Sequence, residues 1–118
     1  MPYVDGFVLP ISRRNIPAYL SMSRKAGKIW KQLGALEYRE CIGDDLKIEG
    51  ALTFLKAARA KTGETVIFSW ITHKSRAHRD RVNARVMKDP RILRMMKVKC
   101  PFDVKRMAMG GFKVRVDL

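Results

Sequence analysis

The chain has 118 residues, of which 47% are hydrophobic and 31% charged, so we expect a single globular domain, residues 1–118, and not a disordered chain. Its 25 Lys and Arg residues against 11 Asp and Glu residues give a formal net charge of +14, which attracts nucleic acids, anionic lipid surfaces and acidic metabolites. The apolar runs are too short to span a membrane, and no basic region followed by an apolar segment opens the chain. We therefore expect a cytoplasmic protein without a membrane partner.

The first third of the chain predicts a strand, a helix and a second strand. Residues 3–11 are apolar on both sides, which is typical of a buried strand. A helix follows from Ser12 or Asn15, either of which suits an N-cap, and runs to about Leu33. Its basic residues lie mostly opposite its inward apolar stripe. Residues 35–42 then form the second predicted strand.

The middle of the chain is the least regular part and leads into the strongest predicted strand. Thr53 can cap a short helix over residues 54–60, but residues 46–62 are equally compatible with an irregular excursion. Residues 65–72 read as a strand, with Phe68 and Trp70 on one of its faces.

The last third predicts a charged helix and a final strand. Ser75 is a good N-cap for a helix over residues 75–88, and residues 91–97 can add another turn after Pro90. The inward sector of the helix is unusually polar, because it contains His78, Arg79 and Asn83 beside two valines. The final strand runs from residue 106 or 107 to 116, with a bulge or a close approach at Gly110-Gly111.

The order β-α-β-β-α-β predicts an α+β fold, an antiparallel four-stranded sheet with two helices on one face. A sheet face left open to water should alternate with polar residues. Here adjacent positions such as Phe7 and Val8, or Ile67 and Phe68, are apolar on both faces. We therefore expect a second copy of the chain to cover the open face in a symmetric homodimer.

Arg79 and Asn83 form the most suggestive polar pair, one helical turn apart on the inward side. A buried guanidinium needs an anion, so Arg79 either pairs with Asp5 or Asp103 or awaits an anionic ligand, and pairing is the usual outcome. A second cluster, Asp103-Lys105-Arg106, either fixes a loop by salt bridges or binds a carboxylate or phosphate.

Aromatic and histidine side chains supply the remaining candidates. Tyr3, Tyr19, Trp30 and Trp70 either line an apolar pocket or form ordinary core. His73 and His78 have the chemistry of a general base, although the sequence places no second acid–base group beside them. The candidate ligand-binding residues are Tyr3, Asp5, Trp70, His78, Arg79, Asn83 and Arg106.

Short motifs along nearly the whole chain resemble, in the same order, those of the YbaA-like bacterial family of unknown function. The resemblance implies a ferredoxin-like fold of the dimeric α+β barrel superfamily, with a ligand pocket between sheet and helices, and it implies no established reaction. The basic helix faces, and Val104 where a glycine is expected, depart from the family pattern. The motifs are Tyr3-Val4-Asp5-Gly6-Phe7, Gly34-Ala35-Leu36, Glu40-Cys41 with Gly43-Asp44-Asp45, Phe68-Ser69-Trp70, Asp89-Pro90-Arg91, Pro101-Phe102-Asp103 with Lys105-Arg106-Met107, and Gly110-Gly111-Phe112.

No motif assigns a reaction. The sequence has no Gly-rich phosphate loop and no nucleophile–base motif, so whether the protein is an enzyme stays open. Cys41 and Cys100 have no His or Cys at ligand spacing, and we predict no metal, no disulfide and no cofactor.

Two functional hypotheses remain. The first is a homodimer that binds a small molecule, anions included, in a pocket between sheet and helices. The alternative is an RNA-binding module that stacks bases on Phe68 and Trp70 and uses the +14 charge. The alternative is less favoured, because the third strand lacks the glycine and basic residue of the usual signature and a dimer would bury these aromatic rings.

Overall fold

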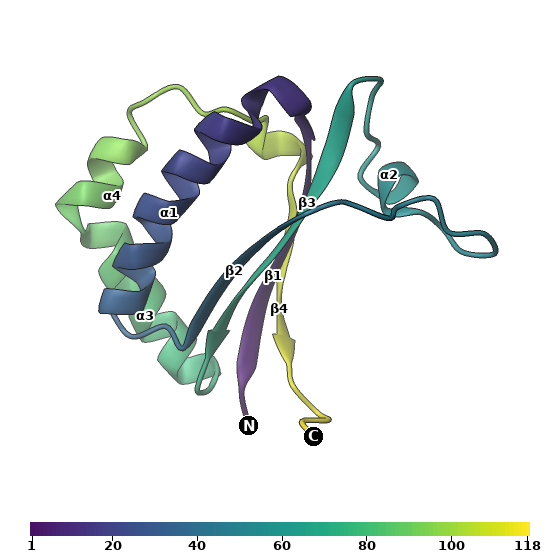
Figure 1. Ribbon diagram of the computed structural model, residues 1–118. Coiled ribbons are helices and arrows are strands. Elements are labelled where there is room, and N and C mark those ends of the chain that lie inside the picture. The colour runs from purple at the N-terminus through teal and green to yellow at the C-terminus, as the bar shows by residue number, and fades with distance from the viewer.

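The computed structural model describes residues 1–118 and contains one four-stranded antiparallel sheet, with helices on one face (Figure 1). The strand order is β2-β3-β1-β4, so the predicted βαββαβ topology is confirmed. The elements are β1 (Tyr3–Ser12), η1 (Arg13–Asn15), α1 (Ile16–Gln32), β2 (Glu37–Ile42), α2 (Phe54–Ala57), β3 (Glu64–His73), α3 (Arg76–Lys88), α4 (Pro90–Met95), η2 (Val104–Arg106) and β4 (Ala108–Lys113).

The two central strands, β1 and β3, pair over ten residues each, from Tyr3 opposite His73 to Ser12 opposite Glu64. Side chains alternate along a strand, so the odd-numbered residues of both strands point toward the helices and the even-numbered ones point away. Leu9 and Ile67 face each other on the helix side and are 1% and 0% exposed. This register determines which side chains of the two strands face the helices and which face the open side of the sheet.

The core has two apolar clusters under the helices. Buried Leu9, Ile11, Tyr19 and Ile67 form the first, and buried Ile29, Val82, Val86 and Ile92 form the second. The second cluster joins α1 to α3 and to α4, the extra turn expected after Pro90. The three helices therefore form one layer on one side of the sheet (Figure 1).

Side-chain caps set the starts of α2, α3 and α4, whereas the predicted cap of α1 was wrong, because neither Ser12 nor Asn15 makes a side-chain capping hydrogen bond. The Ser75 hydroxyl accepts a hydrogen bond from the His78 backbone N–H at 3.1 Å, so the predicted N-cap of α3 is confirmed. Thr53 caps α2 in the same way through the Lys56 N–H. The short helix ends at Ala57 and not at residue 60, because Arg59 takes a positive φ of 53° and breaks the helical path.

The predicted last strand was wrong in length, and of the two alternatives predicted at Gly110-Gly111 the bulge is not the one found. β4 spans Ala108–Lys113, and it stops there because Lys113 already pairs with Tyr3, the first residue of β1. Gly110 and Gly111 pair in regular register, without a bulge. The alternative of a close approach is confirmed at Gly111, where an added Cβ would overlap the Tyr3 ring.

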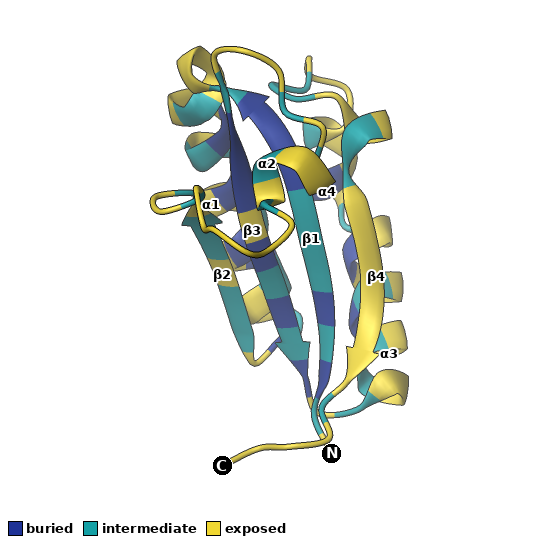
Figure 2. Cartoon of the chain, turned by 90° about the vertical axis from the view of Figure 1, so that its right-hand side faces the viewer, coloured by how far each residue is buried: buried dark blue, intermediate teal, exposed yellow.

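On the open face of the sheet the chain leaves many residues exposed or only half-buried, as the colours in Figure 2 show, and several of these residues are apolar. Phe68 and Phe112 are 45% and 61% exposed, and α2 places Phe54 beside Phe68 with ring centroids 6.0 Å apart. The prediction that several strands are apolar on both faces is therefore confirmed. Among the helices, none has both the length and the apolar character needed to cross a membrane.

Candidate functional site

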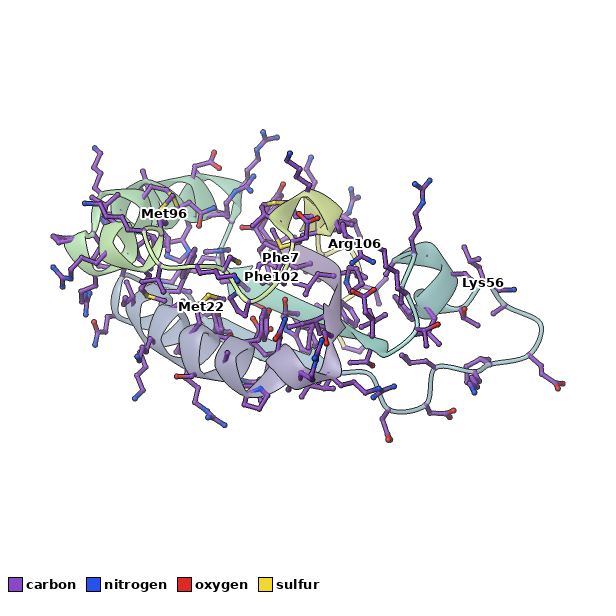
Figure 3. The ribbon with its side chains drawn as sticks, turned by 90° about the horizontal axis from the view of Figure 1, so that it is seen from above. Phe7, Met22, Lys56, Met96, Phe102 and Arg106 are labelled. Carbon is purple, nitrogen blue, oxygen red and sulfur yellow. The ribbon has the colours of Figure 1, made fainter.

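A cavity of about 380 Å³ lies between the helix layer and the sheet. Side chains from α1, α3, all four strands and the loop before η2 line it, and most of them are apolar. Three of the lining side chains are Phe7 of β1, Met22 of α1 and Phe102 of that loop. Figure 3 labels them near the middle of the molecule. The size and the mainly apolar lining are those of small-molecule sites.

Glu40 of β2 provides a carboxyl group in the cavity wall. The Tyr19 hydroxyl donates a hydrogen bond to Glu40 Oε2 at 2.6 Å, from α1 across to the sheet. Beside this pair, Ser23 and Tyr38 share a hydrogen bond at 3.1 Å. The pairing register explains the arrangement, because Tyr38 and Glu40 stand opposite Ile71 and Ser69, which point toward the helices.

Burial sets the protonation behaviour of this cluster. Desolvation raises the pKa of the Glu40 carboxyl above its usual range, although hydrogen bonds from Tyr19, Ser23 and Tyr38 oppose the rise. It also raises the pKa of Tyr38 to about 12 and that of Tyr19 further, so both phenols remain protonated donors. No cation contacts Glu40 within ion-pair distance. Glu40 can therefore hold or release a proton inside an apolar cavity.

A second polar cluster is centred on Asp5 of β1. Arg79 Nη1 donates to Asp5 Oδ1 at 2.8 Å, and Asn83 Nδ2 lies 3.5 Å from Asp5 Oδ2. The Trp30 indole N–H donates to Asn83 Oδ1 at 3.1 Å, which ties α1 to the same cluster. The Arg79 guanidinium also lies 4.9 Å above the Tyr3 ring. Of the two predicted uses of Arg79, structural pairing with Asp5 is therefore the one found.

The two histidines lie at the edge of this second cluster. His73 is fully buried, neither ring nitrogen has a hydrogen-bond partner, and Nε2 is 3.7 Å from Asp5 Oδ2. Desolvation lowers the pKa of His73, so the ring stays neutral. His78 Nδ1 accepts a hydrogen bond from the Lys74 N–H at 3.0 Å, which fixes the start of α3. Neither histidine lines the cavity.

The structure brings four of the seven candidate residues to the cavity: Asp5, Trp70, Arg79 and Asn83. Trp70 borders it only at the strand, since its alternation directs the indole to the open face, where the Phe68 ring lies 5.6 Å away. Tyr3 and His78 lie outside the lining, next to Arg79 and His73 respectively.

Arg106 is not part of the cavity wall. It makes two hydrogen bonds of 2.8 Å to the Glu64 carboxylate and a third, of 2.9 Å, to the Arg59 carbonyl. The hydrogen bonds from Arg106 lower the pKa of the Glu64 carboxyl to about 2. Of the two predicted roles for this cluster, Arg106 thus has the loop-fixing one, at the end of β3 remote from Asp5.

Sequence reasoning missed Glu40 and Tyr38 as site residues. A signal was present, because a glutamate at an inward position of a strand is unusual. Reading it required the register of β2 against β3, which places Glu40 on the helix side.

Comparison with known proteins places the chain in a family. Residues 2–104 match the family described as protein of unknown function (DUF1428). This chain belongs to the DUF1428 family. It is 39% identical over 117 residues, 99% of each chain, to the uncharacterised protein YbaA of Escherichia coli strain K12, and equally so to YbaA of Shigella flexneri. The resemblance read from the sequence motifs is therefore confirmed.

Solved structures share the fold of this DUF1428 chain at low sequence identity. SnoaB, a cofactor-independent oxygenase from Streptomyces nogalater, superposes with a TM-score of 0.63 at 10% identity, covering 99% of this chain and 96% of SnoaB. A dimeric ferredoxin-like protein from an uncultured marine organism gives 0.60 at 13% identity, covering all of both chains. Rv0793 from Mycobacterium tuberculosis also gives 0.60, at 13% identity, over 99% of this chain and 98% of Rv0793. These likenesses show the ferredoxin-like fold.

Replacing Asp5 should show how much the ion pair between Asp5 and Arg79 contributes to the free energy of unfolding. Asp5→Asn leaves Arg79, whose side chain is only 20% exposed, with the exposed Asp80 as its remaining counter-charge, and we expect the free energy of unfolding to fall by about 2–4 kcal/mol in urea titrations. Glu37→Gln, which disrupts the exposed contact with Arg39 at 3.6 Å, is the matched control and should cost less than about 1 kcal/mol. Equal losses in both variants would contradict the central role of Asp5.

The raised pKa of Glu40 predicts a pH-dependent stability difference. In the folded state the carboxyl binds its proton at a higher pH than in the unfolded chain, so ionised Glu40 destabilises the fold at neutral pH. This cost disappears as the pH falls below the unfolded value of about 4.3. Glu40→Gln should therefore be more stable than the wild type at pH 7, with the gain shrinking at pH 4.

Urea titrations of both proteins at the two pH values measure this difference. Glu49→Gln, on an exposed loop, serves as the control and should change stability little at either pH. A Glu40→Gln difference that is the same at both pH values would show that burial does not control this carboxyl.

Proposed function

We propose that this protein is a homodimer and that each subunit binds one small, mainly apolar molecule in the cavity between the helix layer and the sheet. The observation that carries the proposal is the cavity of about 380 Å³, apolar along most of its wall, with Glu40, Tyr19, Tyr38 and Ser23 gathered at one place. Apolar walls supply affinity, and a few converging polar groups fix the orientation of the ligand.

The charges of the lining favour a neutral ligand. Arg79 already pairs with Asp5 at 2.8 Å, so an anion would have to compete with a buried carboxylate for it. The other charged side chain that points into the cavity is Glu40, because Arg39 of β2 points to the open face, and a carboxylate repels an anion. A neutral molecule with a hydroxyl group fits best, because the hydroxyl can donate to Glu40 and accept from a tyrosine.

Glu40 is also the group best placed to act on such a ligand. An ionised carboxyl with a raised pKa is a stronger base than an ordinary glutamate, and Glu40 lies in the cavity wall where a ligand can reach it. Proton removal from a ligand hydroxyl is therefore the chemistry that this site supports. The shared fold of SnoaB, at 10% identity, adds no assignment of a reaction.

The open sheet face supports the homodimer. Phe54, Phe68 and Phe112 are each 45–61% exposed and lie on one face, together with apolar residues of β1. Arg39 and Glu37 are the charged residues at this face of β2, and they lie 3.6 Å apart. A self-complementary apolar surface fits a second copy of the chain, and a structure of the same fold is described as dimeric. RNA would meet little positive charge here.

Introducing a charge into this face should separate the subunits. We expect the wild type to sediment as a particle of twice the 13.6 kDa chain mass at micromolar concentration, and Phe68→Asp to sediment as a monomer. Leu93→Asp is the matched control, because Leu93 is exposed to the same 45% but lies in the helix layer, and it should remain dimeric. A monomeric wild type would remove the proposal of a dimer.

A pair of probes that differ by one hydroxyl tests the ligand class. We expect 1-naphthol to bind more tightly than naphthalene, as followed by quenching of tryptophan fluorescence, because only 1-naphthol can donate to Glu40. Ala26→Trp, which fills the cavity from α1, should abolish binding of both probes. Glu40→Gln should reduce the preference for 1-naphthol.

Two results would overturn the ligand proposal. One is the absence of binding by either probe to a folded wild-type protein. The other is probe binding that Ala26→Trp leaves unchanged, since the probe would then occupy another surface. The far-ultraviolet circular dichroism of each variant, compared with the wild type, confirms that the fold is retained.

A further inference from the structure

The net charge of the chain lies entirely in one layer of the fold. Residues 13–33 and 74–99, which hold α1, α3, α4 and their flanking turns, contain 16 of the 25 Lys and Arg residues but 2 of the 11 Asp and Glu residues. This part alone accounts for the net charge of +14. The sheet and the remaining loops contain nine basic and nine acidic residues and are neutral. We call residues 13–33 and 74–99 the basic layer.

Most of these basic side chains are available to a partner. All of them except Arg79 are exposed. Two of them make ion pairs: Arg79 pairs with Asp5 and Asp80, and Arg91 pairs with Asp89. The other 14 of the 16 basic residues have no carboxylate within ion-pair distance. The layer thus presents a dense and uncompensated positive field to solvent.

We propose that the outer face of the basic layer binds the phosphate backbone of double-helical nucleic acid. On α1, Arg24, Lys28 and Lys31 recur at spacings of four and three residues, which places them in one row along the helix. On α3, Arg81, Arg85 and Lys88 form a second row with the same spacing. Two rows of cations on neighbouring helices suit a rigid rod of phosphates.

The side chains between the basic residues indicate backbone contact without base stacking. Proteins that hold single strands place exposed aromatic rings beside their cations. The aromatic residues of the basic layer are Tyr19 and Trp30, and both point inward to the cavity. Small residues, such as Ala77 and Ala84 on α3, lie between the basic positions and let a phosphate backbone approach closely. A duplex, recognised by charge and shape, fits this surface better than a single strand.

A lipid surface fits the layer less well. Interfacial helices bury a continuous apolar face in the headgroup region. The apolar stripe of α1 already packs on the core through Tyr19 and Ile29. Exposed apolar side chains of the layer are confined to the end of α3 and to the α4 region, where Leu93 and Met96 lie. Most of the charged surface therefore has no apolar group to insert.

The duplex surface and the dimer surface are on opposite sides of the sheet, so one does not exclude the other (Figure 1). This inference does not depend on the cavity or its ligand. It also differs from the hypothesis in which Phe68 and Trp70 stack RNA bases, because the sheet face supplies neither charge nor rows of cations.

A matched pair of triple variants tests the inference by fluorescence anisotropy with a labelled duplex DNA between about 50 and 200 mM salt. The first variant is Lys25→Gln, Lys28→Gln and Lys88→Gln in the basic layer. The second is Lys47→Gln, Lys56→Gln and Lys61→Gln, three exposed lysines outside it, where Figure 3 shows Lys56 far from Met96 of the basic layer. Both variants lose the same charge and retain Arg79.

We expect the wild type to bind the duplex with an affinity that falls steeply with salt. The basic-layer variant should bind at least about fivefold more weakly at low salt, and the dependence of log Kd on log salt should flatten by up to about 0.9 for each lysine that no longer neutralises a phosphate. The control variant should stay within about twofold of the wild type. If the control variant raises the anisotropy of the labelled duplex as much as the wild type does, loss of three positive charges alone has little effect on binding.

Three outcomes would overturn the inference. Equal weakening in both variants would show that only the total charge matters. No binding by the wild type at about 50 mM salt would remove the interaction. Binding to phosphatidylserine vesicles that the basic-layer variant loses, without binding to the duplex, would assign the layer to an anionic lipid surface.

Discussion

The ten-residue antiparallel register between β1 and β3 is the constraint on which the rest of the structure depends. It directs Asp5, Phe7 and Ile71 toward the helices, where they form the sheet side of the cavity. It directs Val8 and Phe68 to the other face, where they join the apolar surface. A shift by one residue would exchange the two sets and place Asp5 among the exposed phenylalanines. The internal site and the external apolar face are therefore two consequences of a single pairing.

Burial of polar groups on the helix side of the sheet costs hydration free energy, and the structure compensates this cost more fully at Asp5 than at Glu40. Asp5 has Arg79 as a counter-charge and a further donor in Asn83, so its charge is well compensated. Glu40 has hydrogen-bond donors but no cation, and burial raises its pKa. The first arrangement is typical of a structural ion pair that fixes α3 on the sheet. The second leaves a carboxyl without a counter-charge in the cavity wall, which is why the proposed ligand chemistry rests on Glu40 and not on Arg79.

Local sequence patterns predicted the elements, and non-local pairing decided the site. The strand at residues 65–72, the Ser75 cap and the inward position of Arg79 all follow from alternation or helical periodicity, which a few neighbouring residues determine. The Tyr19–Glu40 hydrogen bond joins residues 21 positions apart, and the Arg106–Glu64 pair joins residues 42 apart. Such choices depend on which strands become neighbours, so the sequence pattern identified Arg79 but not Glu64, the partner that holds Arg106 outside the cavity wall.

The basic layer is a feature that stability alone does not explain. Like charges three or four residues apart on a helix repel each other, and α1 contains no acidic residue to offset its own. Arg76 begins α3, where the helix dipole disfavours a cation. Outside the basic layer the chain contains equal numbers of basic and acidic residues, so the excess of positive charge is specific to the layer. A polyanion bound along the layer would reduce this repulsion, so a bound nucleic-acid duplex should raise the free energy of unfolding of the protein.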